Sequence, residues 1–407
     1  MGKDVRLCER KLLNRESSTS LSVPPVNHEP LIIKDMDFIE QIDQYDWDTV
    51  QAGIYGKTAQ DVEIALHKSG RLDIGDFMAL VSPSALPYLE PMAELSRRYT
   101  RQRFGNTIQF YIPLYLTNSC INHCIYCGFN HGNDIRRIIL TDEQILREAA
   151  AIKAIGDFQH ILLVTGENPR EAGADYMENA IRLVKPQFAS ISLEVQPLKE
   201  EEYKQLSNAG LNAVYCYQET YNKARYKTYH PKGMKSKFDH RLDAFDRMGR
   251  AGVHKIGLGV LIGLEDWRTD VTMMATHLRY LQKTYWQSKY SISFPRMRPH
   301  EGEEFRPNVI MSDKELAQLI FACRIFDRDV EMTLSTRESS AFRDNMTTLG
   351  ITSLSAGSKT DPGGYAVYKQ ELEQFAVNDD RTPAEVVEAV RRQGCEVVWK
   401  DWDLSLQ

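Results

Sequence analysis

The chain has 407 residues, of which 42% are hydrophobic, 26% charged and 10% aromatic, with a formal net charge of −6. This composition can bury a large core, and it excludes a fibrous or intrinsically disordered chain. The acidic balance with scattered Lys and Arg excludes a nucleic-acid-binding surface, and the absence of both a transmembrane run and a secretory h-region predicts a cytoplasmic protein without membrane contacts.

The first hundred residues divide into two parts. Roughly the first 30 include "SSTSLSVPPVNHEP", a composition that predicts loose order. From Asp37 to Arg101 the pattern is helical, as in "TAQDVEIALH" and "PYLEPMAELSRRYTRQRF". We therefore assign residues 1–100 to an N-terminal tail and helical extension.

From Thr107 onward, short β-rich runs alternate with amphipathic helical runs, which is typical of βαβ units and a parallel sheet. The predicted strands are 107–117, 160–167, 190–196, 213–219, 255–263, 290–298, 331–336 and 353–358. The predicted helices between them are 141–156, 177–187, 199–210, 239–252, 268–286, 313–327 and 341–350. This order predicts an α/β fold with a (βα)8 TIM-type barrel over residues 101–358, whose chemistry lies at the C-terminal ends of the strands. A doubly wound open sheet is the alternative, because the sequence does not reveal closure.

After the last predicted strand, "TPAEVVEAVRRQG" combines a helix cap, an apolar stripe and a terminal glycine. It predicts a helix, and we assign residues 359–407 to a C-terminal helical cap. The stretch "EVVWKDWDLSLQ" then closes the chain.

The stretch "TNSCINHCIYCGFNHG" directly follows the first predicted strand and contains Cys120, Cys124 and Cys127. In a reducing compartment, clustered thiols indicate a metal site or catalysis more often than disulfides. The spacing would also place three small buried residues on one helix face. However, the surrounding Asn, Ser and Gly favour a loop.

Two kinds of metal site suit these thiols. A structural zinc ion would need a fourth ligand, which His123 or His131 could supply. Three thiolates without a fourth ligand suit a [4Fe-4S] cluster with one open iron, because complete clusters usually take four cysteines.

The motif C-x3-C-x-(aromatic)-C, with Tyr126 as the aromatic residue, resembles that of the radical S-adenosylmethionine (SAM) superfamily. Its place after the first strand matches that family too, as does "TGE" (Thr165, Gly166, Glu167) at the end of the second strand. The resemblance implies a [4Fe-4S] cluster on the three cysteines and SAM on its open iron. A deoxyadenosyl radical formed there would need the closed interior of a barrel.

A closer resemblance rests on "RQRFGNTIQFYIPLYLTNSCINHCIYCGFN", "LLVTGE", "LEVQPL", "YQETY", "YSISFPRMRP", "LSTRES" and "SAGSKTDPGGY". Together they are similar to the tyrosine lyases, the 2-iminoacetate synthase family of bacterial thiazole biosynthesis. That family abstracts hydrogen from the amino group of L-tyrosine and splits its Cα–Cβ bond into 4-cresol and 2-iminoacetate (dehydroglycine). The resemblance also implies thiazole synthase as a protein partner, and an electron donor such as flavodoxin or ferredoxin.

The resemblance implies roles for five residues around SAM. Tyr126 would pack near the adenine, and Gly166 and Glu167 would hold the amino group. Glu194 and Gln218, polar residues on apolar strands, would reach the ribose hydroxyls, and structural hydrogen bonds within the barrel explain them almost as well. For Glu167 the alternative is a charge at the start of the next helix. The glycines of "GLGVLIG" lie within a strand, which favours close approach to adenine over a dinucleotide loop.

The tyrosine contacts implied by the resemblance are Tyr115, Arg337 and Ser355. The fork of Arg337 suits the substrate carboxylate, and a salt bridge to Glu338 is its structural alternative. Further candidates for carboxylates are Arg296 and Arg298. His230 would be either a proton donor or a surface residue.

Three rival functions stay open at this point. The tyrosine lyase of hydrogenase maturation carries a second cluster on a C-terminal extension with its own cysteine motif, whereas only Cys395 follows Cys323 here. A tryptophan lyase would have the same strand ends. A non-catalytic Cys3His metal protein is the rival outside the lyases.

Overall fold

The computed structural model describes residues 37–68, 70–297, 305–368, 374 and 376–401. The predicted loose N-terminal tail and Arg298 lie outside these residues. Within them, no helix combines the length and the apolar character needed to cross a membrane. All eight predicted strands are present, each starting within one residue of its predicted position; the first also ends where predicted, and the other seven end earlier.

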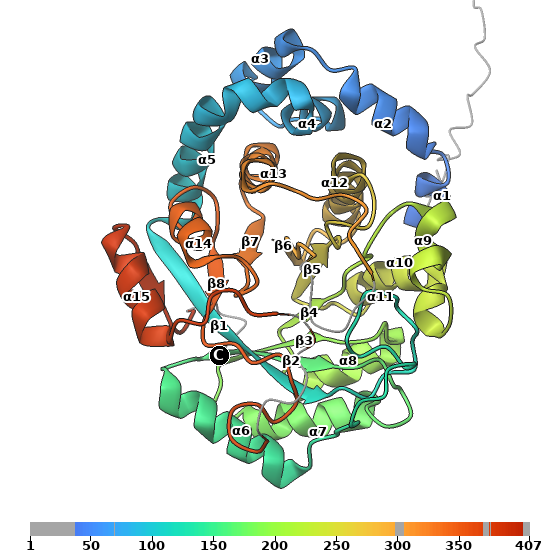
Figure 1. Ribbon diagram of the computed structural model, residues 1–407, viewed down its shortest axis with the longest axis vertical. Coiled ribbons are helices and arrows are strands. Elements are labelled where there is room, and N and C mark those ends of the chain that lie inside the picture. Colours follow the sequence, from blue (N-terminus) through green and yellow to red (C-terminus); the bar gives the residue numbers. More distant parts are fainter. Residues whose placement is uncertain (1–36, 69, 298–304, 369–373, 375, 402–407) are drawn as a thin grey trace, which may run out of the picture. The chain divides into compact units, whose positions relative to one another are not determined.

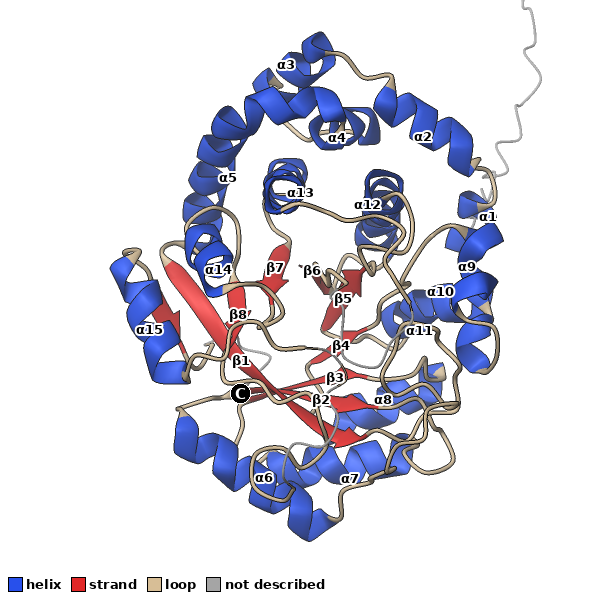
Figure 2. Cartoon of the chain, in the orientation of Figure 1, coloured by secondary structure: helices blue, strands red, loops and turns tan. Residues whose placement is uncertain are grey.

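The strands form a closed parallel barrel (Figure 2). They are β1 (Thr107–Thr117), β2 (His160–Thr165), β3 (Ser190–Glu194), β4 (Ala213–Tyr215), β5 (Lys255–Gly259), β6 (Lys289–Ser293), β7 (Glu331–Leu334) and β8 (Ser353–Ser355). Strand β1 pairs with β8 on one side and with β2 on the other, which closes the ring. The (βα)8 prediction is therefore confirmed, and the open-sheet alternative is wrong.

The barrel helices follow the predicted order. They are α6 (Asp142–Ile155), α7 (Ala174–Val184), α8 (Glu200–Ala209), α9 (Lys223–Tyr229), α10 (Phe238–Leu242), α11 (Ala244–Arg250), α12 (Trp267–Thr284), α13 (Asp313–Phe326) and α14 (Ser340–Met346). Helix α6 begins with the expected capping box, because Thr141 and Gln144 cap each other. The predicted helix 239–252 is divided into α10 and α11 at Asp243.

The segment before the barrel is helical over the described residues. It comprises α1 (Phe38–Ile42), α2 (Trp47–Tyr55), α3 (Ala59–His67), α4 (Ile74–Val81), a 3-10 turn (Pro83–Tyr88) and α5 (Leu89–Phe104). These helices curve around the outside of α12 and α13 (Figure 1). Their apolar side chains, such as Phe77 against Phe326 of α13, extend the core beyond the barrel.

The C-terminal segment differs from a purely helical cap. The predicted helix is present as α15 (Pro383–Arg392), but it is followed by β9 (Glu396–Val398), which pairs in parallel with β1. Trp399, just after β9, packs edge-on against Phe110 and Phe158. The strand was not predicted because its three residues are stabilised by distant parts of the chain, the start of β1 and the rings around Trp399.

The interior of the barrel is lined largely by polar and aromatic residues, whereas TIM barrels usually fill this space with Val, Ile and Leu. Gly257 and Gly259 on β5 make room for two aromatic rings. A methyl group on Gly257 would lie 2.1 Å from the ring of Tyr215, and one on Gly259 would lie 2.6 Å from the ring of Tyr217. The space beside the two glycines is therefore filled by Tyr215 of β4 and by Tyr217, which follows this strand. The sequence had predicted the adenine of SAM in this position.

Candidate active site

Two adjoining cavities lie in the barrel. The first, here called the cysteine pocket, is lined by Cys120, Cys124, Cys127, Tyr126, Gly166, Glu167, Glu194, Glu219, Lys235 and Arg241 among others. The second, here called the inner pocket, is lined by Tyr111, Tyr115, Ser293, Thr333, Ser355 and Thr360 among others. Glu194, Tyr217 and Arg337 line both. The residues expected around the cluster and those expected around tyrosine thus fall into two cavities that share a wall, with Gln218 as the exception.

The cysteine loop is fixed to the barrel by backbone hydrogen bonds. The Gly166 amide donates to the Thr117 carbonyl at 2.8 Å, and the Ile121 amide donates to the Glu167 carbonyl at 3.1 Å. On the other side, the His123 amide donates to the Lys232 carbonyl at 3.1 Å. The loop is therefore positioned by the ends of β1 and β2 and by the segment after α9.

Gly166 lies where the loop crosses the end of β2. A methyl group at this position would lie 2.3 Å from the carbonyl oxygen of Ser119, a distance that backbone atoms cannot accept. The glycine expected to contact SAM therefore has a second role, which is to let the cysteine loop approach the sheet.

We expect Gly166→Ala to push the cysteine loop away from β2. Overpacking of this kind costs about 1–3 kcal/mol, so the variant should lose both stability and iron loading after anaerobic reconstitution. Gly132→Ala, in the same loop, is the control, because its added methyl meets nothing nearer than 3.5 Å. Equal iron content in the two variants would contradict this role for Gly166.

The three thiols are largely shielded from water. Burial raises the pKa of the Cys127 thiol to about 11, and it also raises the pKa values of Cys120 and Cys124. The ammonium of Lys235 opposes this shift at all three cysteines. Since thiolates bind metals and thiols do not, the nearby positive charge favours the form that a cluster requires.

The arrangement of donors differs from that of a zinc site. Among the described residues, no three His, Cys, Asp or Glu side chains converge as closely as one metal ion requires. A [4Fe-4S] cluster ligates each cysteine through a different iron and so keeps the sulfurs apart. His123 and His131 pack against each other with ring centroids 5.2 Å apart, and the Nδ1 of His131 hydrogen-bonds to the Cys120 carbonyl.

Four charged side chains form a network beside the cysteines. Glu167 accepts hydrogen bonds from Arg241 at 2.8 Å and from Asn122 at 2.7 Å. Glu219 accepts one from Lys235 at 2.7 Å. Burial raises the pKa of Glu167, but the charges of Arg241 and Lys235 outweigh it and hold that pKa below its ordinary value. Glu167 is therefore ionised, as binding of an ammonium group requires.

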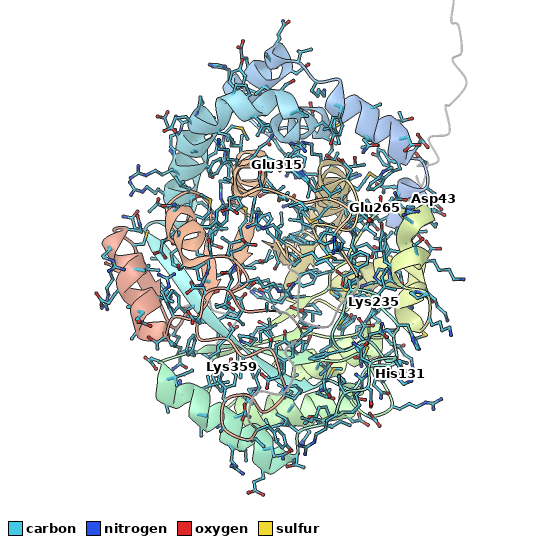
Figure 3. The ribbon with its side chains drawn as sticks, viewed as in Figure 1. Asp43, His131, Lys235, Glu265, Glu315 and Lys359 are labelled. Carbon is cyan, nitrogen blue, oxygen red and sulfur yellow. The ribbon has the colours of Figure 1, made fainter. Side chains whose placement is uncertain are left out.

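Most of this network was missed from the sequence. Glu219 is the one non-glycine residue with positive φ (+70°) in the described part of the chain, and such backbone strain is typical of functional sites. Lys235 comes from the long segment after α9 and lies at the side of the barrel near α10 (Figure 3). The alternation of the strand was a usable signal for Glu219, since Tyr215, Tyr217 and Glu219 share one face.

Gln218 is not brought to either pocket. Its side chain is fully buried, and neither of its polar atoms has a hydrogen-bond partner within the described structure. Its neighbours Tyr217 and Glu219 line the cysteine pocket instead. A contact between Gln218 and the ribose stays a prediction, and the position of Gln218 outside both pockets does not favour it.

Tyr126 and His230 form a buried pair behind the cysteines. The Tyr126 hydroxyl lies 2.8 Å from His230 Nε2, and His230 Nδ1 lies 2.9 Å from the Tyr226 carbonyl oxygen. Because a carbonyl only accepts, Nδ1 carries the proton and Nε2 accepts from Tyr126. Burial and the charges of Lys235 and Arg241 hold the pKa of His230 well below its usual range. His230 is thus a neutral, fully buried residue, so the alternative of a surface residue is wrong.

We expect Tyr126→Phe to leave His230 Nε2 buried without a donor. An unsatisfied buried acceptor costs about 1–3 kcal/mol, so the midpoint of denaturant unfolding should fall accordingly. Tyr45→Phe, at a tyrosine that is 44% exposed, should leave the midpoint unchanged. Indistinguishable midpoints for the two variants would show that the Tyr126–His230 bond adds no stability.

The inner pocket gathers the three predicted tyrosine contacts. The Tyr115 hydroxyl donates to Gln374 at 2.8 Å, and burial raises the pKa of Tyr115 far above its ordinary value. Ser355 Oγ accepts from the Thr336 amide at 3.1 Å. Burial raises the pKa values of Tyr115 and Glu194. The positive charge of Arg337 opposes this rise at both residues. Arg337 thus acts electrostatically on both pockets.

Arg296 has a structural role. It is buried, donates to the Met311 carbonyl at 3.0 Å and forms ion pairs with Glu338 and with Asp313. Glu338, named above as the structural partner of Arg337, therefore binds Arg296. Arg296 is accordingly a weaker candidate for a ligand carboxylate than Arg337.

The segment after β8 is anchored over the barrel by Glu148 of α6. This buried carboxylate accepts hydrogen bonds from the amides of Tyr365, Ala366 and Val367 at 2.7–2.9 Å. The Tyr365 hydroxyl donates to the Pro113 carbonyl at 2.8 Å. These bonds fix the chain before Gln374, which reaches Tyr115.

Comparison with known proteins identifies this arrangement. Residues 114–274 match the family model of the radical SAM superfamily, and residues 293–396 match that of the biotin and thiamin synthesis associated domain. The crystal structure of HydG, a maturase of the [FeFe]-hydrogenase, aligns with a TM-score of 0.82 and 30% identity over 90% of this chain and 81% of that chain. The fold and the cysteine pocket thus define a radical SAM barrel.

The 2-iminoacetate synthase of Escherichia coli (strain K12) is 52% identical over 370 residues, which cover 91% of this chain and 97% of that protein. The 2-iminoacetate synthase of Salmonella typhimurium is 50% identical, with 90% and 97% covered. The chain belongs to the 2-iminoacetate synthase family.

The radical SAM family implies a [4Fe-4S] cluster and SAM, and the residues present fit both groups. Three cysteines line one pocket without a fourth cysteine among its lining residues. Beside them, two carboxylates and two cations offer partners for the ammonium and the carboxylate of an amino acid. The ammonium and the carboxylate of a bound amino acid can each pair with one of these charges, so that no buried charge is left unpaired.

Proposed function

We propose that this chain is a radical SAM carbon–carbon lyase that cleaves the Cα–Cβ bond of L-tyrosine into 2-iminoacetate and 4-cresol for thiamine thiazole biosynthesis. SAM is cleaved to methionine and 5′-deoxyadenosine in the same reaction. The observation that carries the proposal is the 52% identity to the Escherichia coli 2-iminoacetate synthase over nearly its whole length. The three cysteines, the charged residues of the pocket wall and the enclosed barrel are consistent with it.

When bound, the cluster and SAM supply a deoxyadenosyl radical. In this proposal Cys120, Cys124 and Cys127 ligate the cluster. Glu167, ionised beside Arg241, takes the SAM ammonium, with Gly166 and Tyr126 lining the same pocket. Glu194 stands in the wall between the pockets, where a ribose hydroxyl would meet it.

The inner pocket would hold tyrosine. Arg337 lies in the shared wall, so a substrate carboxylate bound there would bring the amino group toward the cysteine pocket. Tyr115 and Ser355 line the rest of the cavity as hydroxyl partners. The barrel and the segment held by Glu148 would exclude water from the radical.

The proposal includes two protein partners and a location. Thiazole synthase would accept 2-iminoacetate directly, because this imine hydrolyses readily in water. A flavodoxin or ferredoxin would supply electrons. The cytoplasm is the expected compartment, since it keeps thiols reduced.

The test is anaerobic incubation of the reconstituted enzyme with SAM, dithionite and tyrosine. We expect 5′-deoxyadenosine, 4-cresol and glyoxylate, the hydrolysis product of 2-iminoacetate, in equal amounts. Tryptophan in place of tyrosine should give no indole-derived product. Deoxyadenosine without cresol would retain the radical SAM class and remove tyrosine as the substrate.

A further inference from the structure

A small hollow lies beside the cysteine loop. Its apolar rim consists of Ile121, Pro169, Pro197 and Met234. Ile121 and Met234 are exposed by 36% and 38%, so a partner could contact both side chains. The hollow is here called the rim hollow.

The floor of the rim hollow is the charge network of the active site. Glu167, Lys235 and Arg241 line both the hollow and the cysteine pocket. One layer of side chains therefore separates the outer surface from the three cysteines. Ile121 itself stands in the chain between Cys120 and Cys124.

The backbone beneath the rim is fixed. Gly233, at φ +94°, passes so close to the cysteine loop that a methyl group there would lie 2.2 Å from Asn122 Oδ1 and 2.9 Å from the Ile121 carbonyl oxygen. The Lys235 amide donates to Asn122 Oδ1 at 3.0 Å. A partner that touches Met234 is thus held against a rigid segment packed directly on the cysteine loop.

Exposed cations lie close in the chain to two of the rim residues. Arg170 follows Pro169, and Lys232 and Lys237 flank Met234, all three with exposed side chains. Two carboxylates near these cations in the chain bind other residues. Glu171 accepts a hydrogen bond from Asn168 at 2.8 Å, and Asp239 forms an ion pair with Lys223 at 2.9 Å. Because the whole chain carries a net charge of −6, this positive edge is opposite in sign to the average surface.

We propose that the rim hollow docks an acidic one-electron carrier protein. This inference rests on the proposed function, which needs one electron from outside for each reductive cleavage of SAM. The carrier donates one electron and is itself oxidised, and no covalent bond changes in the transfer. An apolar centre with a positive edge is complementary to an acidic partner and would also speed its encounter.

The experiment uses the anaerobically reconstituted holoenzyme and flavodoxin as the probe. The variants are Arg170→Glu, Lys232→Glu and the double variant Lys232→Glu/Met234→Asp. The control is Lys283→Glu, an exposed lysine in the last turn of α12 and therefore at the opposite end of the barrel. Titration of labelled flavodoxin gives the dissociation constant at two salt concentrations.

We expect the double variant to bind flavodoxin at least about tenfold more weakly than the parent. Each single variant should bind about threefold more weakly, and the control should bind like the parent. Salt should weaken binding of the parent more than that of the double variant. A double variant that binds like the parent would overturn the docking site. Loss of thiazole synthase binding instead would assign the hollow to that partner and likewise overturn the proposal.

A second readout separates this inference from the proposed function. With dithionite as the reductant, the double variant should form 5′-deoxyadenosine within about twofold of the parent, but with subsaturating reduced flavodoxin about tenfold less. Equal loss with both reductants would mean a damaged site and would overturn the docking assignment. If the parent itself forms no deoxyadenosine with dithionite, the proposed function fails, and the binding titration still decides whether flavodoxin uses the hollow.

Discussion

Replacement of Cys124 by Ala is expected to abolish 5′-deoxyadenosine formation. Cys124 is the most buried of the three clustered cysteines, and it contributes to a small apolar cluster with Tyr126, Tyr229 and Leu261. Without its thiolate only two cysteines of the pocket remain, and a [4Fe-4S] cluster cannot be held by so few ligands. The iron content and the electron paramagnetic resonance signal of the reduced protein, with and without SAM, measure this directly.

Cys323→Ala is the matched control. Cys323 is equally buried, but it lies in α13 away from both pockets, where a free cysteine packs as a small apolar residue. The control should retain its iron, its spectrum and its deoxyadenosine. If Cys124→Ala keeps a SAM-dependent signal, the assignment of the cysteine pocket as the cluster site is wrong.

Replacement of Arg337 by Ala is expected to weaken tyrosine binding with little change in the dependence on SAM. Loss of one partner from a desolvated carboxylate pair costs about 2–5 kcal/mol, so the KM for tyrosine should rise by about 30-fold or more. Deoxyadenosine formed without tyrosine should persist, because the cysteine pocket keeps its own charges. Initial rates of cresol formation against tyrosine and SAM concentration measure both effects.

Arg337→Lys tests the geometry of the contact. Lysine keeps the charge but not the planar fork, so partial recovery of KM is expected. Arg296→Lys serves as a comparison, since Arg296 is held by Glu338 and Asp313 and should change stability more than KM. An Arg337→Ala variant with unchanged dependence on tyrosine would remove Arg337 from the substrate site.

Much of the architecture could be predicted because it depends on local patterns. The eight strands and the helices α6, α8, α12, α13 and α15 follow from periodicity, capping boxes and terminal glycines. Except for the first strand, the strand ends were predicted too far along the chain, since residues such as Glu167 and Thr336 lie beyond the paired part of their strands and line the pockets. The short β9 had no local signal, because it is stabilised by the edge of β1 and the rings around Trp399.

By itself, the sequence determined the class of chemistry. The spacing of the three cysteines after a strand, and the glycine and glutamate at the end of the next, identify a motif whose ligands are neighbours in the chain. It also placed Tyr115, Arg337 and Ser355 together, through resemblance to a family, before any contact was known.

Only the tertiary structure decided which side chains surround these residues. Barrel closure was decided by the pairing of β1 with both β2 and β8. The network of Glu167, Glu219, Lys235 and Arg241, and the burial of His230 behind Tyr126, join segments from different strands and loops. Such contacts between charges far apart in the chain have no periodic signature, because they depend on how burial and ion pairing balance in the folded protein.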